Sequence, residues 1–125
     1  MLFDTDVLTW LFRGKATAAR LVERAHERAV SVVTYMELLQ GARNRQEIRE
    51  IKSFLSDFAF HMSPLSENIG HRASIYMAEY ALQCAMSMAD ALVAATAVEH
   101  GLTLCTANDK HYKPVHDLEM KIVRP

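Results

Sequence analysis

The sequence predicts an α/β fold, a three-layer α/β/α sandwich around a mostly parallel central sheet. Short apolar runs typical of buried strands alternate along the chain with longer segments in which apolar residues have helical spacing. The run 29–33 is largely valine and uninterrupted, as in a strand covered on both faces. Polar side chains, mostly acidic, follow several of the predicted strands. In parallel sheets ligands gather outside the carboxyl ends of the strands, so these side chains predict a site there.

The composition is that of one domain, over residues 1–125, with half of its residues hydrophobic. The formal net charge of -1 neither indicates nor excludes nucleic-acid binding, because a bound metal can supply local positive charge. No apolar run has the length of a membrane span and no basic-then-apolar leader is present. Cys84 and Cys105 form no ligand-spaced cluster. We therefore expect a cytoplasmic protein with reduced thiols and no membrane partner.

The first half of the chain begins with a strand over 1–3 that stops at Asp4. Asp4 and Asp6 then open a helix that Gly14 ends. Thr34 and Glu37 have the spacing of a capping box, which predicts that a helix begins there. The further predicted elements are helix 17–28, strand 29–33, helix 34–41, helix 46–58 and the extended piece 60–65.

The second half contains a helix that begins at Asp90, with Ser87 just before it, and ends near Gly101. Its small residues at positions 94, 95 and 97 allow it to lie close against the sheet. A strand over 102–105 follows, with polar residues 106–109 at its end. The further predicted elements are helix 66–84, a loop or broken turn at 110–114 and a last strand over 118–123.

Each acid at a strand end or helix start has an ordinary explanation when it is taken singly. Asp4 and Asp6 can cap a helix, Glu37 fits a capping box, and Asp90 is favoured in a first turn by the helix dipole. Capping does not explain why polar, mostly acidic residues recur where strands end. We therefore favour the convergence of Asp4, Glu37 and Asp90 in one cleft, together with Asn108.

Four segments taken together resemble the PIN domain, specifically the VapC-type toxins of type II toxin–antitoxin systems, over essentially the whole chain. They are Leu2-Phe3-Asp4-Thr5-Asp6, the stretch 31–41 containing Thr34-Tyr35-Met36-Glu37-Leu38, the stretch 90–97, and Leu104-Cys105-Thr106-Ala107-Asn108. The resemblance implies a three-layer α/β fold, Mg²⁺- or Mn²⁺-dependent ribonuclease activity, a homodimer and inhibition by a cognate antitoxin.

Carried over by position, the resemblance implies that Asp4, Glu37 and Asp90 are the core acids. Asp6 stands where the family usually has Asn. The last acid of the family is absent, because Asn108 and His111 occupy its usual positions. Asp109 is adjacent and can substitute. Whether the site holds one metal ion or two is therefore open.

Hydrolysis of a phosphodiester requires that an anionic transition state be stabilised, and carboxylates alone repel the phosphate. Carboxylates that hold Mg²⁺ make the site cationic and lower the pKa of bound water. We predict that Asp4 and Asp90 bind the principal metal directly and that Glu37, the third predicted metal residue, binds it through water or helps to orient the attacking water. The predicted catalytic set adds Asn108 to these three acids. The predicted outer-shell residues are Asp6, Thr106, Asn108 and Asp109.

The basic residues suggest where RNA phosphates bind. We expect four residues to contact them, because they follow elements that lead from the acidic edge: Arg13, Lys15, Arg43 and Lys110. The other basic residues are expected to lie on solvent-exposed helix faces. Two alternatives stay open. One is a PIN fold with impaired catalysis. The other is a receiver-like Mg²⁺-binding interaction module, which needs a phosphoacceptor Asp at the end of a central strand; Asp57 instead follows a helical pattern.

Overall fold

The computed structural model describes residues 1–124, and its central sheet has the strand order β3-β2-β1-β4-β5. The strands are β1 (Leu2–Phe3), β2 (Ala29–Ser31), β3 (His61–Ser63), β4 (Leu104–Thr106) and β5 (Met120–Ile122). The helices are α1 (Thr5–Phe12), α2 (Ala16–Arg24), α3 (Val32–Gln40), α4 (Arg45–Asp57), α5 (Glu67–Cys84), α6 (Met88–Glu99) and α7 (Asp109–Tyr112). Neighbouring strands pair in parallel throughout this sheet. The predicted α/β fold with a mostly parallel sheet is confirmed.

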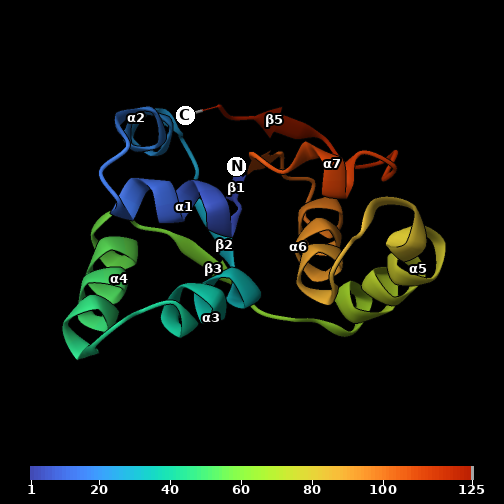
Figure 1. The fold of residues 1–125 in the computed structure, drawn as a ribbon, viewed down its shortest axis with the longest axis horizontal. Helices are drawn as coiled ribbons and strands as arrows, with labels where there is room; N and C mark the ends of the chain where they lie inside the picture. Colours follow the sequence, from blue (N-terminus) through green and yellow to red (C-terminus); the bar gives the residue numbers. More distant parts are fainter. Residues whose placement is uncertain (125) are drawn as a thin grey trace.

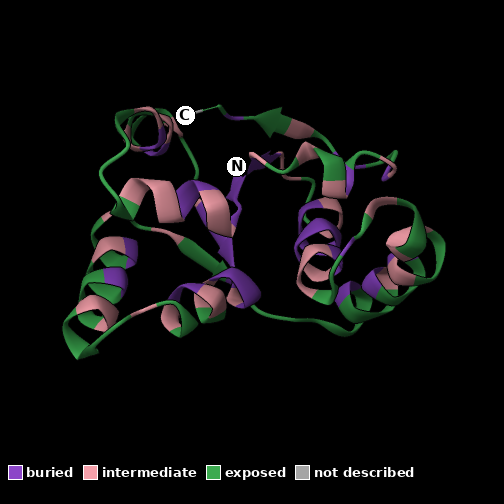
Figure 2. Ribbon diagram, viewed as in Figure 1, coloured by how far each residue is buried: buried purple, intermediate pink, exposed green. Residues whose placement is uncertain are grey.

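Helices cover both faces of the sheet (Figure 1). On one side α1, α2, α3 and α4 pack around Phe3, Val7 and Val30, and on the other α5, α6 and α7 pack around Leu2 and Leu104. Figure 2 shows β1 and β2 buried along their length and α6 buried along much of its surface. The small residues predicted to let α6 lie close against the sheet are fully buried.

The register of the sheet sets the carboxyl ends of β1 and β4 side by side. Phe3 lies opposite Cys105, and the Asp4 N–H donates to the Cys105 carbonyl at 2.9 Å. One residue further on, the Val123 N–H donates to the Thr106 carbonyl at 2.9 Å. Asp4 and Thr106 therefore leave the sheet at the same edge, although the whole domain separates them in sequence.

Two predicted helix starts are wrong, and in both cases the serine hydroxyl decides the position. Ser31 accepts from the Val33 N–H, so α3 begins at Val32, the predicted strand over 29–33 ends early, and the predicted capping box at Thr34 and Glu37 does not form. The capping box lies instead at Ser87 and Asp90, and α6 begins at Met88. Val32 and Val33 favour a strand, but the cap formed by Ser31 outweighs this preference and places both in the first turn of α3.

Two further boundaries also differ from the predictions. Helix α2 ends at Arg24, since Ala25 is extended, and the Arg28 guanidinium donates to the carbonyls of Val22 and Glu23 at that end. Helix α7 forms one turn where a loop or broken turn was predicted, and it turns Tyr112 into the core. No helix within residues 1–124 combines the length and hydropathy needed to cross a membrane.

Candidate functional site

Asp4 stands between the end of β1 and the start of α1, and its side chain is buried, with 6% of its surface exposed. Its Oδ1 caps α1 by accepting from the Thr5 N–H at 2.9 Å. Its Oδ2 accepts from the Thr106 hydroxyl at 2.8 Å and from the Tyr112 hydroxyl at 2.9 Å. Asp4 does cap a helix, as its position in the sequence also allowed, but the cap uses only one of its two carboxylate oxygens.

Asp90 reaches the same place from the other side of the sheet. Its Oδ2 accepts from the Ser87 N–H at 3.0 Å, which completes the capping box, and lies 3.2 Å from His111 Nδ1. Its Oδ1 lies 3.2 Å from the hydroxyl of Tyr112. The carboxylates of Asp4 and Asp90 thus contact one phenol oxygen, which brings together two acids from opposite halves of the chain.

Glu37 lies in the interior of α3 and is held by a single side chain. Its Oε1 accepts from the Thr5 hydroxyl at 2.7 Å, while the Thr5 N–H binds Asp4. A series of close contacts therefore runs from Glu37 through Thr5 to Asp4, and from Asp4 through the Tyr112 phenol to Asp90. The structure thus links the three predicted core acids into one network through two residues, Thr5 with its hydroxyl and backbone N–H, and Tyr112 with its phenol.

Tyr112 is the residue of this network that sequence reasoning missed. It lies in the segment predicted as a loop or broken turn, yet it is fully buried and packs in the core cluster beneath α6. The sequence did indicate that Tyr112 is buried, because it is the one aromatic residue in the otherwise polar stretch from Asp109 to Lys113. Periodicity cannot show it, because α7 has a single turn.

The predicted outer-shell residues have separate roles around this network. Asp6 accepts from the backbone N–H groups of Val7 and Ala107, at 2.7 and 3.0 Å, and so ties α1 to the end of β4. Thr106, besides donating to Asp4, accepts from the Asn108 N–H at 3.1 Å. The exposed Asn108 side chain makes no cap bond at α7. Asp109 pairs at 3.2 Å with Arg124, whose side chain comes from beyond β5.

The electrostatics of the buried acids favour added positive charge. Burial, and then the charge of Asp6, raise the pKa of Asp4 to about 6, against hydrogen bonds from Thr106, Thr5 and Tyr112 that lower it. Burial also raises the pKa of Asp6, although hydrogen bonds, chiefly from the N–H groups of Ala107 and Val7, oppose it. Burial, followed by the charges of Asp4 and Asp90, raises the pKa of Tyr112. The phenol is therefore a neutral donor at physiological pH.

Proton counting at Tyr112 shows why these residues fit a cation. A phenol has one proton, so it donates to only one of the two carboxylate oxygens that it contacts. The second contact then needs a proton on a carboxyl group or a nearby cation to offset the repulsion. Carboxylates are the ligands that Mg²⁺ prefers. Across residues 1–124, however, no three His, Cys, Asp or Glu side chains are gathered around one point as metal ligands.

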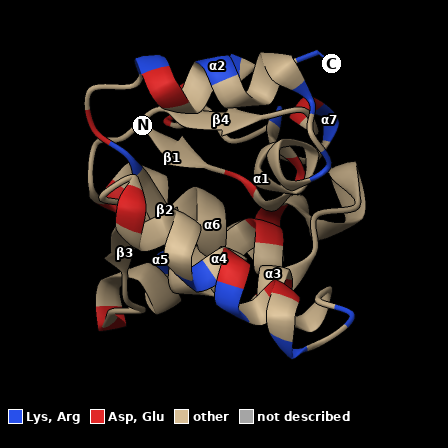
Figure 3. Ribbon diagram, turned by 90° about the vertical axis from the view of Figure 1, so that its left-hand side faces the viewer, with Lys and Arg blue, Asp and Glu red and all other residues tan. Residues whose placement is uncertain are grey.

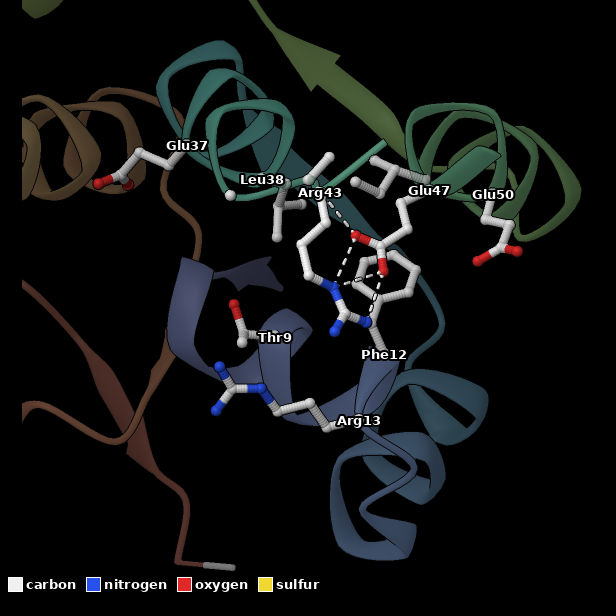
Figure 4. A pocket seen from close by; sticks show the side chains of 11 residues that line it. Thr9, Phe12, Arg13, Glu37, Leu38, Arg43, Glu47 and Glu50 are labelled. Atoms are coloured by element: carbon white, nitrogen blue, oxygen red, sulfur yellow. Dashed lines mark hydrogen bonds and ion pairs between the residues drawn. The ribbon is translucent and has the colours of Figure 1, made fainter. Parts of the chain in front are cut away.

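A groove of about 520 Å³ between α1, α3 and α4 leads to Glu37. Figure 4 shows Glu37 at one end of it and Phe12 across from Leu38 further along. Arg43 and Arg13, both predicted to contact RNA, line the groove. Arg43 pairs with Glu47 at 2.9 Å, whereas the other two predicted contacts, Lys15 and Lys110, are exposed outside it.

Comparisons with known proteins agree on one family. A family model described as the PIN domain matches residues 1–116. The chain is 32% identical to "Ribonuclease VapC10" of Mycobacterium tuberculosis, and the match covers 100% of this chain and 95% of that protein. It is 30% identical to "Ribonuclease VapC1" of Rickettsia felis, with coverage of 98% and 96%.

Solved structures have the same fold. A "Toxin-antitoxin complex from Klebsiella pneumoniae" matches with a TM-score of 0.80 and 30% identity over 94% of this chain and 93% of that one. The "Crystal structure of VapBC2 from Rickettsia felis bound to a DNA fragment from their promoter" matches with a TM-score of 0.81 over 98% of both chains. At 18% identity this second match shows the fold alone.

Proposed function

The chain belongs to the PIN domain family, and we propose that it is the ribonuclease toxin of a toxin–antitoxin pair. The ribonuclease names of its relatives support the reaction, and the similarity to a toxin–antitoxin complex supports the biological setting. The observation that carries the proposal is the contact of Asp4 and Asp90 with one buried phenol, because it sets two carboxylates from distant parts of the chain in one site.

We propose that Asp4 and Asp90 hold Mg²⁺ or Mn²⁺, with Glu37 bound to it directly or through water. The ion, when bound, supplies positive charge for the phosphate and lowers the pKa of a water ligand. Thr106 and Tyr112 orient Asp4 by donating to its Oδ2. The outer position of Glu37, on the hydroxyl of Thr5, suits the orientation of an attacking water.

The direct test compares purified wild-type protein with Asp4→Asn and with Asp57→Asn. Both variants lose one negative charge, but Asp57 is exposed at the end of α4. Divalent-ion binding is measured by calorimetry, and RNA cleavage is mapped by sequencing of the 5′ ends. We expect metal binding and metal-dependent cleavage in the wild type and in Asp57→Asn, and neither in Asp4→Asn.

The same measurements separate the alternatives. The absence of divalent-ion binding that depends on Asp4 supports a PIN fold with impaired catalysis. Metal binding that depends on Asp4 without any RNA cleavage supports a receiver-like module. Equal cleavage by the wild type and Asp4→Asn contradicts the proposed site. Expression in cells adds a second readout, since the wild type should arrest growth and Asp4→Asn should not.

We further propose that a segment of the cognate antitoxin binds in the groove between α1, α3 and α4. Its apolar part, around Phe12 and Leu38, suits apolar side chains, and its end at Glu37 suits a cationic residue placed where the metal binds. Phe12→Ala should weaken the complex with the co-expressed antitoxin by about ten-fold or more, as at an interface hot spot. Met62→Ala is the matched control, because Phe12 and Met62 are 37% and 36% exposed.

A homodimer is proposed as the solution state. Ile75 and Leu82 lie seven residues apart on α5, so they share one face, and both are exposed. Light scattering coupled to size-exclusion chromatography should give twice the mass of 14.1 kDa calculated for one chain. A monomer over the whole concentration range contradicts this part of the proposal.

A further inference from the structure

A second groove, with a volume of about 250 Å³, lies between α2 and β5, outside the network of acids. Its α2 wall is formed by Thr17, Arg20, Leu21 and Arg24, whose spacing places them on one helix face. The wall opposite is the edge strand of the sheet with the residues that follow it, Lys121 to Arg124. Figures 1 and 3 show α2 and the C-terminal end of the chain side by side.

The charge of this groove differs from that of the protein as a whole. Four cations line it, Arg20, Arg24, Lys121 and Arg124, in a chain whose formal net charge is -1. Considering residues 1–124, the first three form no ion pair, and Arg124 contacts Asp109. A charged edge strand discourages pairing with other strands, which explains Lys121 but neither Arg124, which follows the strand, nor the cations of α2.

The groove is continuous with the edge that carries the acids. Arg124 donates to the Ala107 carbonyl at 3.2 Å, and the Ala107 N–H in turn donates to Asp6. Ile122 lies opposite Thr106, the residue whose hydroxyl binds Asp4. One end of the groove is therefore separated from the end of β1, where Asp4 stands, by the single strand β4.

We propose that the groove between α2 and β5 binds the sugar–phosphate backbone of the RNA beside the bond that is cut. This inference rests on the proposed ribonuclease function and adds a contact outside its catalytic centre. Guanidinium groups bind phosphate oxygens through two parallel N–H bonds, and the groove offers those of Arg20 and Arg24, while the guanidinium of Arg124 pairs with Asp109. Its aliphatic side chains, Leu21 and Ile122, suit the faces of riboses and bases. RNA fits this combination better than an acidic peptide does, because a phosphate chain has charge along its whole length.

The test replaces three groove cations and, as a control, three cations elsewhere. The groove variant is Arg20→Gln, Arg24→Gln and Lys121→Gln. The matched control is Arg45→Gln, Arg49→Gln and Lys52→Gln on α4, whose residues are likewise exposed. Both variants lose three positive charges. Binding of fluorescein-labelled single-stranded RNA is followed by anisotropy without divalent metal and at several salt concentrations, so it does not depend on catalysis.

We expect the groove variant to bind RNA about ten-fold more weakly and its salt slope to fall by about 2, since each phosphate contact on a single strand contributes roughly 0.7. The control should retain the wild-type slope. Cleavage of an oligonucleotide too short to reach the groove should be unchanged in the groove variant, whereas cleavage of long RNA should slow. Arg20→Lys with Arg24→Lys keeps these positive charges and Lys121, so it should bind RNA more tightly than the groove variant but less tightly than the wild type, because lysine lacks the paired N–H donors. The unchanged cleavage of the short oligonucleotide excludes a folding defect as the cause.

Equal weakening in both triple variants would overturn the proposal, because it would mean that only overall charge matters. Normal RNA binding by the groove variant, combined with loss of the co-expressed antitoxin, would also overturn it and assign the groove to a protein partner. If the wild type binds RNA through this groove but cleaves none, the ribonuclease proposal fails and the binding groove stands.

Discussion

Asp90 and Glu37 are acids of the same network, but the protein holds them in opposite ways. The carboxylate of Asp90 accepts from Ser87 and contacts both Tyr112 and His111. Glu37 accepts from one hydroxyl, that of Thr5. A carboxylate bound by several donors has one orientation, whereas a longer side chain held by one hydrogen bond can swing. We infer that Asp90, together with Asp4, defines the site and that Glu37 adapts to what binds there.

The comparison also shows that helix capping and function are not competing explanations. Asp90 completes a capping box and Asp4 caps α1, yet both have an oxygen on Tyr112. Glu37, for which the sequence offered the strongest capping argument, caps nothing. A carboxylate has two oxygens and about four lone pairs, so one oxygen can serve the backbone while the other faces the site.

Of the two acids compared, Asp90 should give the larger effect when it is replaced, in Asp90→Asn. The amide still accepts from the Ser87 N–H, so α6 keeps its start, but the charge at Tyr112 is lost. We expect RNA cleavage to slow by about 1,000-fold, as when a transition-state charge loses its fixed partner. Single-turnover rates at saturating Mn²⁺ measure this. A smaller loss in Asp90→Asn than in Glu37→Gln would reverse the ranking of the two acids.

The second effect is a dependence of stability on pH that arises in the buried half of the network. Burial raises the pKa of Asp4 from 3.8 to about 6, so between these values the folded protein binds more protons than the unfolded chain. The contribution of Asp4 to the free energy of unfolding is therefore fully present below about pH 4. It is lost as pH rises through about 6, and it amounts to up to about 3 kcal/mol. Urea unfolding of the metal-free protein measures it.

The control for this pH effect is Asp4→Asn, which has no proton to lose and should show a flatter profile. Saturating Mg²⁺ should flatten the wild-type profile as well, because the cation replaces the proton as the partner of the carboxylate. If the wild type and Asp4→Asn have parallel profiles, Asp4 does not hold the raised pKa.

Tyr112→Phe should have the third-largest effect. The ring still fills the core beneath α6, but both carboxylates lose the hydroxyl that they contact. We expect the metal-free protein to be destabilised by about 1–2 kcal/mol, the cost of a lost buried hydrogen bond to a charged group. Tyr35→Phe is the control, since its half-buried side chain lies outside this network. Equal midpoints in urea for both variants would show that the phenol contributes nothing.

The sequence predicted the sheet, its parallel pairing and the edge at which the acids lie, because apolar strands and polar strand ends are local patterns. It did not predict how the acids meet. Tyr112 lies on a helix of one turn, which is too short for periodicity to reveal, and its hydroxyl joins residues far apart in the chain. The start of α3 was misplaced for a local reason, since Ser31 and Thr34 both suit a cap and the earlier one prevails.

The smallest effect on stability is expected at Glu37, and it tests the flexible half of the comparison. In Glu37→Gln the amide oxygen can still accept from the Thr5 hydroxyl, so the free energy of unfolding should change by less than about 0.5 kcal/mol. The cleavage rate of this variant should nevertheless fall about ten- to hundred-fold, as for an outer partner of a metal. A large loss of stability would mean that Glu37 is as firmly built into the fold as Asp90. An unchanged rate would remove it from the site, leaving the two acids on Tyr112 as the minimal centre.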